Sequence, residues 1–196
     1  MEEVNCYKVV MLGDSGVGKT SLVNQITENI FSESHIPTVG SQFTSFSYEI
    51  DKKKLTFELW DIAGQEVYRS LVSFYTRESK GAFLVFDVTN QESFNGLQEW
   101  INFVEESTPG VHIILFANKC DLEEQRKVSK ESLSSFALQH KLHYFEGSAK
   151  TGQEVSNAFD QMAEILISLG ENNSPTNVIE INSKENNKNN KRQCCK

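Results

Sequence analysis

Residues 13–20 have the spacing G-x-x-x-x-G-K-T, which is suited to binding phosphate groups. In this pattern glycines let backbone N–H groups curl around the phosphates, Lys19 reaches the β- and γ-phosphates, and the Thr20 hydroxyl binds Mg²⁺. An apolar run at 9–12 precedes the motif and a helix-like segment follows it, and a helix N-terminus would add positive dipole. A glycine-rich turn could match by chance, but this context favours a phosphate-binding loop.

Three more short motifs each follow a strand-like run: D-I-A-G at 61–64, N-K-C-D at 118–121 and S-A-K at 148–150. Open α/β sheets bind ligands at the carboxyl ends of their strands. There Asp61 could hold Mg²⁺ through water, and Asp121 could accept two N–H donors from one face of a base. Singly, N-K-C-D and S-A-K could be ordinary loops. Their order and their positions at strand ends favour one shared nucleotide site.

A parallel sheet must position these motifs. Strand-like segments lie at 7–12, 46–50, 55–61, 82–88, 111–117 and 142–145, with the second and third forming a hairpin around a turn at 51–54. The continuous apolar runs at 82–88 and 111–117 are typical of parallel strands covered on both faces. Helix-like segments include 21–30 and 155–169, and 31–41 is polar and irregular. We therefore predict an α/β fold with helices on both faces of the sheet. The last helix should contribute core residues at helical spacing: Val155, Phe159, Met162, Leu166 and Leu169.

Composition limits the class of protein. At 196 residues and 22.2 kDa, the chain suits one domain and a tail, and the formal net charge of -8 argues against nucleic acid as a partner. No apolar run approaches the length of a membrane span, and the acidic N-terminus has no signal-peptide core, which predicts a cytosolic chain. Cys6 and Cys120 adjoin apolar runs and should be inert buried thiols. From Gly170 onward, Asn, Ser, Lys and Glu dominate, which predicts a disordered tail.

These motifs together resemble those of a Ras-superfamily small GTPase, and within that superfamily the Rab family, over residues 7–169. The resemblance implies a P-loop NTPase small G domain at 1–170, with a six-stranded, mostly parallel sheet and five helices. It also implies a disordered hypervariable tail with a prenylation site at 171–196. The implied ligands are GTP or GDP with Mg²⁺. The implied phosphate-binding residues are Ser15, Gly16, Val17, Gly18, Lys19, Thr20, Ser21, Thr38 and Gly64. The implied guanine-binding residues are Phe31, Asn118, Lys119, Asp121, Ser148, Ala149 and Lys150, and the implied metal ligands are Thr20, Thr38 and Asp61.

The resemblance further implies a molecular switch in vesicle and membrane trafficking. Switch I would span 31–40, where Thr38 senses the γ-phosphate, and switch II would begin at Gly64. Gln65 would be the catalytic residue that orients the attacking water. No arginine is obviously placed to assist within the chain, so hydrolysis should be slow until an activating protein supplies one. Asp121 would select guanine, because adenine lacks the matching donors on that edge.

Partner recognition would use other residues. Phe43, Trp60 and Tyr75 occupy the positions of the aromatic triad that reads effectors in Rab proteins. Cys194 and Cys195 resemble the Rab double-cysteine ending; because only Lys196 follows them, the ending does not fit C-a-a-X, and each should carry a geranylgeranyl group. The implied protein is a monomer that cycles between cytosol and the cytoplasmic face of an intracellular membrane. Its partners would be effectors, an exchange factor, a GTPase-activating protein, and a GDP-dissociation inhibitor or escort protein.

Some positions depart from the family pattern. Ile62 stands where threonine is usual, Val67 replaces an arginine, and residues 77–80 (R-E-S-K) replace an R-G-A stretch. None is a phosphate or metal ligand, so they put partner choice in doubt. Two alternatives remain: a guanine-nucleotide-locked binding module with negligible hydrolysis, and an ATP-using P-loop kinase. The nucleotide-locked module is disfavoured by Thr38, Gly64 and Gln65, because these residues would function only at the γ-phosphate. The kinase is disfavoured by the N-K-C-D and S-A-K motifs.

Overall fold

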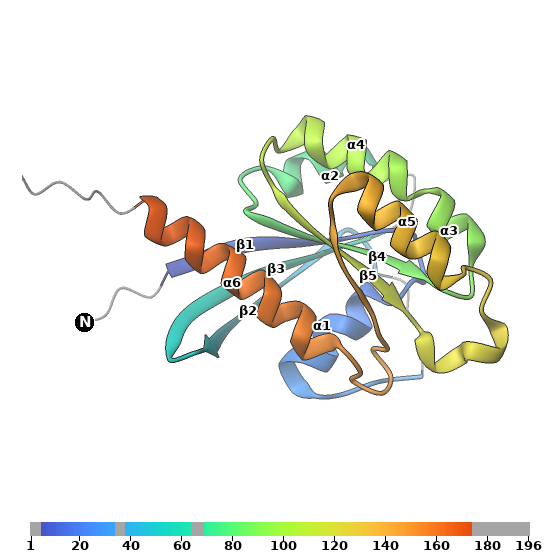
Figure 1. Cartoon of the computed structure of the whole chain (residues 1–196). Coiled ribbons are helices and arrows are strands. Elements are labelled where there is room, and N and C mark those ends of the chain that lie inside the picture. The colour runs from blue at the N-terminus through green and yellow to red at the C-terminus, as the bar shows by residue number, and fades with distance from the viewer. Residues whose placement is uncertain (1–4, 34–37, 64–68, 174–196) are drawn as a thin grey trace, which may run out of the picture.

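The computed structural model describes residues 5–33, 38–63 and 69–173. Its centre is a six-stranded sheet with the strand order β2-β3-β1-β4-β5-β6 (Figure 1). The β2–β3 pair is antiparallel and the other neighbouring pairs are parallel, which confirms the predicted sheet. The strands are β1 (Asn5–Leu12), β2 (Ser41–Ile50), β3 (Lys53–Ile62), β4 (Gly81–Asp87), β5 (His112–Asn118) and β6 (His143–Glu146).

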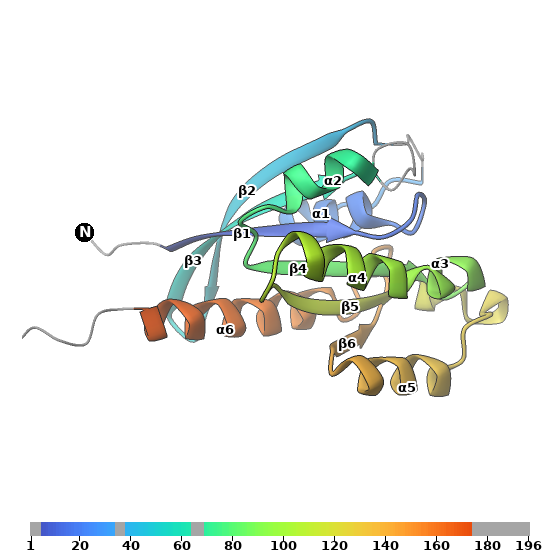
Figure 2. The same ribbon diagram turned by 90° about the horizontal axis from the view of Figure 1, so that it is seen from above.

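Helices cover both faces of this sheet, as predicted (Figure 2). One face packs against α1 (Lys19–Glu28) and α6 (Val155–Asn173). The other packs against α2 (Arg69–Thr76), α3 (Gln91–Asn95), α4 (Leu97–Ser107) and α5 (Lys130–His140). A 3₁₀-helix, η2 (Cys120–Gln125), follows β5. Every residue of β4 is buried, as expected for a parallel strand covered on both faces.

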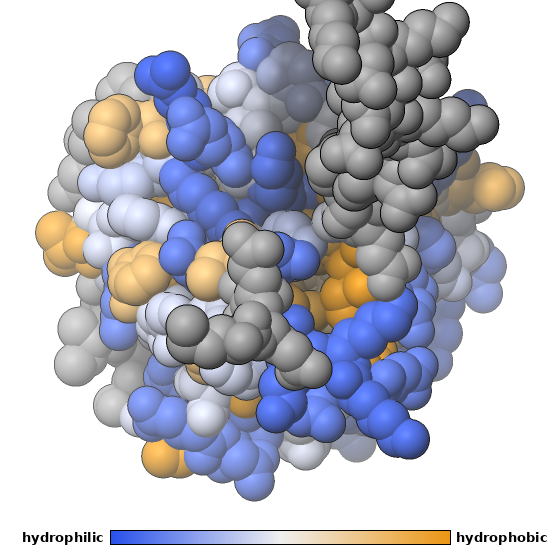
Figure 3. All heavy atoms as spheres, turned by 90° about the vertical axis from the view of Figure 1, so that its left-hand side faces the viewer, coloured by the Kyte–Doolittle hydropathy of each residue, from blue (hydrophilic) through white to orange (hydrophobic). Residues whose placement is uncertain are grey.

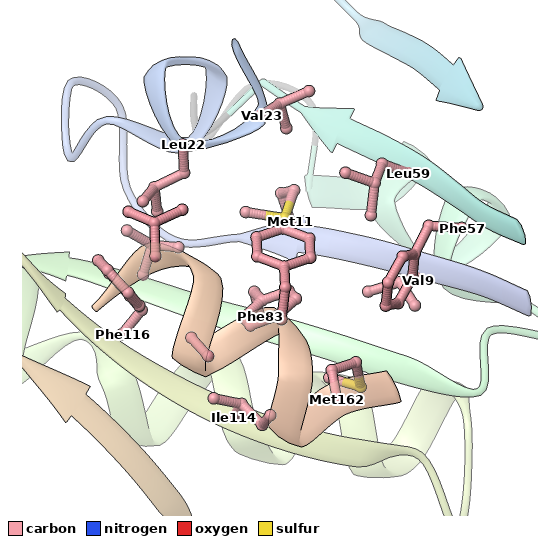
Figure 4. Close-up of a cluster of buried hydrophobic side chains, with 14 of the residues drawn as sticks. Val9, Met11, Leu22, Val23, Phe57, Leu59, Phe83, Ile114, Phe116 and Met162 are labelled. Carbon is pink, nitrogen blue, oxygen red and sulfur yellow. The ribbon is translucent and has the colours of Figure 1, made fainter. Parts of the chain in front are cut away.

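The core under α1 and α6 is apolar and closely packed (Figure 4). There the side chains of Val9 and Met11 on β1 meet those of Phe57 and Leu59 on β3, and Met162 of α6 closes the cluster. Of the five core residues predicted on this helix, Leu169 is partly buried and the others are buried. Each such side chain contributes about 1.5–3 kcal/mol to the free energy of folding when fully buried. This core therefore stabilises the sheet, and the motifs lie at the carboxyl ends of its strands.

Several element boundaries differ from those predicted. The hairpin turn contains only Asp51 and Lys52, with φ values of 48° and 64°, and β3 already begins at Lys53. Positive φ at both central residues is the two-residue turn whose twist matches that of paired strands, so the predicted four-residue turn at 51–54 was too long. Helix α1 begins at Lys19, inside the phosphate-loop motif, and ends before Asn29, whose left-handed conformation caps it.

The helix count also differs from the five that the resemblance implies. The described residues form six α-helices, because Gly96 separates α3 from α4. Gly96 has right-handed helical dihedrals (φ −73°, ψ −12°), so the two helices form a nearly continuous path. Helix α6 continues to Asn173, past the composition change at Gly170. No helix among the described residues has the length and apolar character to cross a bilayer.

The two cysteines of the described region do not lie where their apolar neighbours predict. Cys6 is exposed and Cys120 is partly exposed, so their description as buried thiols was wrong. Cys6 precedes Val9, where β1 begins to pair with β4, so at Cys6 the strand has a neighbour on one side only, β3. The face on which β1 begins and α6 ends is mostly hydrophilic, with scattered apolar side chains (Figure 3).

Candidate functional site

The phosphate loop connects β1 to α1 in a backbone conformation that requires glycine at two positions. Gly13 and Gly18 have φ values of +132° and +99°, which side chains rarely adopt. A Cβ at Gly13 would lie 2.0 Å from the carbonyl oxygen of Val85, and one at Gly18 would lie 2.3 Å from the amide nitrogen of Asn118. The glycines of the motif therefore allow the loop to press against β4 and β5.

Lys19 is the first residue of α1, and its amine lies beneath the loop. Nζ donates hydrogen bonds to the carbonyl oxygens of Gly13 and Asp14, each at 2.8 Å, and the side chain is 6% exposed. Burial lowers the pKa of Lys19 to about 8, although Asp61 and Asp14 favour the charged form. The loop thus holds a buried cation by its own main chain.

Three oxygen-bearing side chains meet beside this lysine. The Thr20 hydroxyl lies 2.9 Å from that of Thr38 and donates to Oδ2 of Asp61. Asp61 is 2% exposed, burial raises its pKa, and hydrogen bonds from the threonines together with Lys19 oppose that rise. Its Oδ1 is buried and has no hydrogen-bond partner among the described residues. Hard oxygen donors and an unsatisfied buried carboxylate oxygen fit Mg²⁺.

Asn118 joins the phosphate loop to the S-A-K motif. Its side chain donates to the carbonyl oxygen of Val17 at 2.8 Å and accepts from the backbone N–H of Ala149 at 2.9 Å. The residue is buried at the carboxyl end of β5. Because both of its amide atoms are satisfied internally, Asn118 acts as a brace between the loops that follow β1 and β6.

A cavity of about 420 Å³ opens above this brace. Asp121 lines it, and Oδ1 of Asp121 accepts a hydrogen bond from the buried Ser148 hydroxyl at 2.6 Å. Lys119 has a left-handed backbone (φ 68°), donates to the carbonyl oxygen of Gly16 at 2.9 Å and pairs with Asp87 at 2.5 Å. The cavity is lined by Gly16, Gly18, Ser21, Phe31, Ser32, Glu33, Asn118, Lys119, Asp121, Leu122, Ser148, Ala149 and Lys150.

The comparisons with known proteins agree with this arrangement. A model of the Ras family matches residues 8–168. The chain belongs to the Ras family. It is 39% identical to Ras-related protein Rab-13 of Bos taurus over 166 residues, which cover 84% of this chain and 82% of the relative. It is 35% identical to Ras-related protein Rab-8B of Homo sapiens over 190 residues, covering 91% and 92%, and 38% identical to Ras-related protein Rab-8A of Bos taurus over 158 residues, covering 80% and 76%. Within the family it is therefore a Rab-like small GTPase.

Residues 31–33 also line the cavity. Phe31 is 37% exposed, and the Lys150 amine lies 5.9 Å from its ring centroid. The same amine forms an ion pair with Glu33 at 3.2 Å. Lys150 therefore connects the S-A-K motif to residues 31–33, and Phe31 lies at the cavity, where the resemblance places it.

Arg126 is a structural residue of the site that sequence reasoning missed. It donates two hydrogen bonds to the Glu146 carboxylate, at 2.8 and 3.1 Å, and one to Glu123 at 2.8 Å. These contacts join the end of η2, which carries Asp121, to the end of β6, which leads to Ser148. No short motif contains the pair, because Arg126 and Glu146 are distant in sequence.

The predicted effector triad forms one aromatic cluster on β2, β3 and α2. Phe43 and Trp60 are directly paired across the hairpin, and their ring centroids are 5.3 Å apart; those of Trp60 and Tyr75 are 5.8 Å apart. Phe74, which was not predicted, packs edge-on against Tyr75 at 5.6 Å and is 73% exposed. The apolar surface is thus wider than the triad.

The remaining predicted residues divide into two groups. Gly64, Gln65, Cys194, Cys195 and the departure Val67 lie outside the described residues. Of the other departures, Ile62 and Ser79 are buried, whereas Arg77, Glu78 and Lys80 are exposed. A partner could therefore contact the exposed residues directly but not Ile62 or Ser79. The described phosphate-loop residues Ser15 and Gly16 are both exposed, as a ligand-binding loop requires.

Proposed function

We propose that the cavity binds GTP and GDP and that this Rab-like GTPase switches between the two states in membrane trafficking. The observation that carries the proposal is the convergence of Lys19, the Thr20–Asp61 pair and the Asp121–Ser148 pair at the carboxyl ends of β1, β3, β5 and β6. Phosphate, metal and base would each meet a matching group within one site. No observation favours the nucleotide-locked alternative.

The phosphate end of the site works by position and charge. The Lys19 ammonium has three N–H donors, of which two bond to loop carbonyls and one would remain for the β- and γ-phosphate oxygens, while loop N–H groups from 15–21 would surround the phosphates. Thr20, Thr38 and Asp61 would hold Mg²⁺, which supplies charge stabilisation for phosphoryl transfer when bound. Phosphoryl transfer needs little covalent help from protein, so these pre-positioned groups suffice for a slow reaction.

The base end selects guanine. Ser148 orients the Asp121 carboxylate, which would accept from N1–H and the exocyclic amine of guanine. Adenine presents no such pair of donors on that edge, and it would leave the carboxylate unpaired, which costs affinity. Phe31 and the aliphatic part of Lys119 would cover the faces of the base. Asn118, Ala149 and Lys150 would complete the site around it.

Hydrolysis is tested at Gln65, which we propose orients the attacking water, with the Gly64 N–H at the γ-phosphate. Gln65→Leu should reduce GTP hydrolysis stimulated by an activating protein by orders of magnitude while GTP affinity stays near that of wild type. Single-turnover assays with and without cell extract measure this. Normal stimulated turnover by the variant would remove Gln65 from its role, and absence of hydrolysis in wild type would favour the locked module.

Membrane attachment is the second part of the proposal. We propose that residues 1–170 form the GTPase domain and that 171–196 tether it, with Cys194 and Cys195 geranylgeranylated. One lipid chain binds a membrane only marginally, and the few lysines of the tail should add little membrane affinity to a protein of net charge -8. Two lipid chains would supply the stable anchor. Effectors would bind the Phe43–Trp60–Tyr75 cluster, and an escort protein or dissociation inhibitor would return the chain to the cytosol.

The tail is tested on protein isolated from its own cell. Intact-mass analysis should show two isoprenoid additions, and the double variant Cys194→Ser/Cys195→Ser should move from membranes to the cytosol. An unmodified C-terminus on membrane-bound protein would refute this part of the proposal without affecting the nucleotide site. Localising the tagged chain with a free C-terminus identifies which membrane it serves.

A further inference from the structure

We propose that Trp100 is a positioning residue of the phosphate loop, acting through Asp14 on Lys19. The inference rests on the proposed nucleotide site. Trp100 lies on α4 and is 5% exposed, and its indole Nε1 donates to Oδ1 of Asp14 at 2.9 Å. The two residues are 86 positions apart in sequence, so no local structure brings them together.

The Asp14 carboxylate lies beside the start of α4. Besides the indole N–H, the backbone at the start of α4 lies against its carboxylate: a Cβ added at Gly96 would lie 3.5 Å from Oδ2. That is an ordinary contact distance, so the carboxylate lies beside the start of the helix. A hydrogen bond to an ionised acceptor is about twice as strong as one between neutral groups, so this contact restrains the loop.

The restraint reaches the lysine through the main chain. The Asp14 carbonyl is one of the two acceptors that hold the buried Lys19 amine, at 2.8 Å. The side chain of Asp14 thus fixes the loop to α4 while its carbonyl fixes the lysine. Trp100 does not line the nucleotide cavity, and its hydrogen bond to Asp14 connects it to the phosphate loop.

The same tryptophan packs beside α2. With Val72 of α2, Trp100 belongs to the buried cluster on this face of the sheet, and the two residues border a small cavity of about 100 Å³ with Glu99 and Phe103. One side chain therefore contacts the phosphate loop and the helix that follows residues 64–68. Loosening it should release nucleotide faster.

The test uses the full chain loaded with fluorescent mant-GDP and Mg²⁺, with release measured after adding excess unlabelled GDP. Trp100→Phe keeps an aromatic ring but removes the donor, and Asp14→Ala removes the acceptor; each should release mant-GDP about tenfold faster. Asp14→Asn keeps an acceptor oxygen without the charge, so its release rate should fall between those of wild type and Asp14→Ala. Gln98→Ala, at an exposed position on the same helix, is the control and should release at the wild-type rate.

Two readouts separate positioning from packing. If both variants break one hydrogen bond, the double variant Asp14→Ala/Trp100→Phe should be no faster than either single variant, whereas independent packing effects would multiply. In ¹⁵N–¹H spectra the Trp100 indole signal, assigned from its ring contacts, should move upfield and exchange faster with deuterium in Asp14→Ala. Multiplying rates or an unmoved indole signal would overturn the inference.

The outcomes also separate this inference from the proposed function. A wild-type chain that binds no mant-GDP would contradict the proposed nucleotide site. The indole signal would still test the Trp100–Asp14 hydrogen bond, because that measurement does not depend on nucleotide. A wild-type chain that binds mant-GDP but whose Asp14→Ala variant releases it at the wild-type rate would contradict the inference alone. Should Trp100→Phe fail to fold, Asp14→Ala with its release rate and indole signal decides the question.

Discussion

Replacing Arg126 by glutamine tests whether the pair it forms with Glu146 stabilises the base-binding end of the fold. The Arg126 side chain is 11% exposed and that of Glu146 is 20% exposed, so the two charge-assisted hydrogen bonds are largely removed from water. Breaking a fully buried ion pair costs about 3–5 kcal/mol, and exposed pairs contribute about 0–1 kcal/mol. We expect Arg126→Gln to lower the free energy of unfolding by about 2–3 kcal/mol.

Two neighbouring charges limit that loss. Lys130 lies 3.6 Å from Glu146 and, at 66% exposure, can compensate part of the unpaired charge. Glu123 accepts a hydrogen bond from Arg126 but is itself largely exposed, so Glu123→Gln should change stability little and serves as the matched control.

Urea unfolding of the nucleotide-free full chain measures the effect. With a slope of about 1–3 kcal/mol per molar urea, the expected loss moves the midpoint down by about 1 M. A double-mutant cycle with Glu146→Gln isolates the pair, and the coupling free energy should exceed about 1.5 kcal/mol. A coupling below about 0.5 kcal/mol, or an equal loss in Glu123→Gln, would show that the pair is a surface contact and would refute the reasoning.

Three further predictions follow from other residues. Lys19 has a pKa of about 8 in the folded chain against 10.5 when unperturbed, and a bound phosphate favours its charged form, so nucleotide affinity should fall as pH rises through about 8; titrations from pH 7 to 9.5 that stay flat would contradict this. Asp121→Asn should weaken guanine binding and shift preference toward xanthine nucleotides, whose 2-oxo group accepts from an amide; competition assays that keep full guanine selectivity would remove Asp121 from its role. Thr76→Val removes a buried hydroxyl 3.0 Å from that of Ser107 and should lower stability by about 1 kcal/mol, read as a drop of several degrees in the melting temperature; an unchanged melting temperature would make this contact unimportant.

The parts of the fold that follow from local pattern could be predicted from sequence. The hydrophobic pattern of the side chains directly indicates which residues are buried. It therefore predicted β4 and β5 from their apolar runs, and β2 and β3 from their alternation. The loop at 13–20 was predictable because the roles of its glycines and lysine depend on backbone conformation within a few residues. Exposure of Cys6 was not predictable, since it depends on where the neighbouring strand β4 begins to pair.

The missed residues share one physical property: their partners lie far away along the chain. Arg126 and Glu146 are 20 positions apart in sequence, and Trp100 and Asp14 are 86 positions apart. Neither contact has a period or a short motif, because it exists only once the sheet has brought the elements together. By contrast, Phe74 adjoins the predicted Tyr75, so its place beside the triad could have been found from the sequence.

The two charged groups at the phosphate end of the site differ in how well the protein itself satisfies them. Lys19 has two main-chain acceptors at 2.8 Å, so its amine is hydrogen-bonded by the loop, and the loop is fixed in turn by Asp14 and Asn118. Asp61 has a raised pKa and a buried oxygen with no hydrogen-bond partner among the described residues, so its charge is poorly satisfied by protein alone. A divalent cation would therefore gain most at Asp61, while the phosphates would meet a lysine already in place. Stabilisation by Mg²⁺ should accordingly depend on Asp61 more than on Lys19, whereas the shape of the loop should depend on its braces more than on either charge.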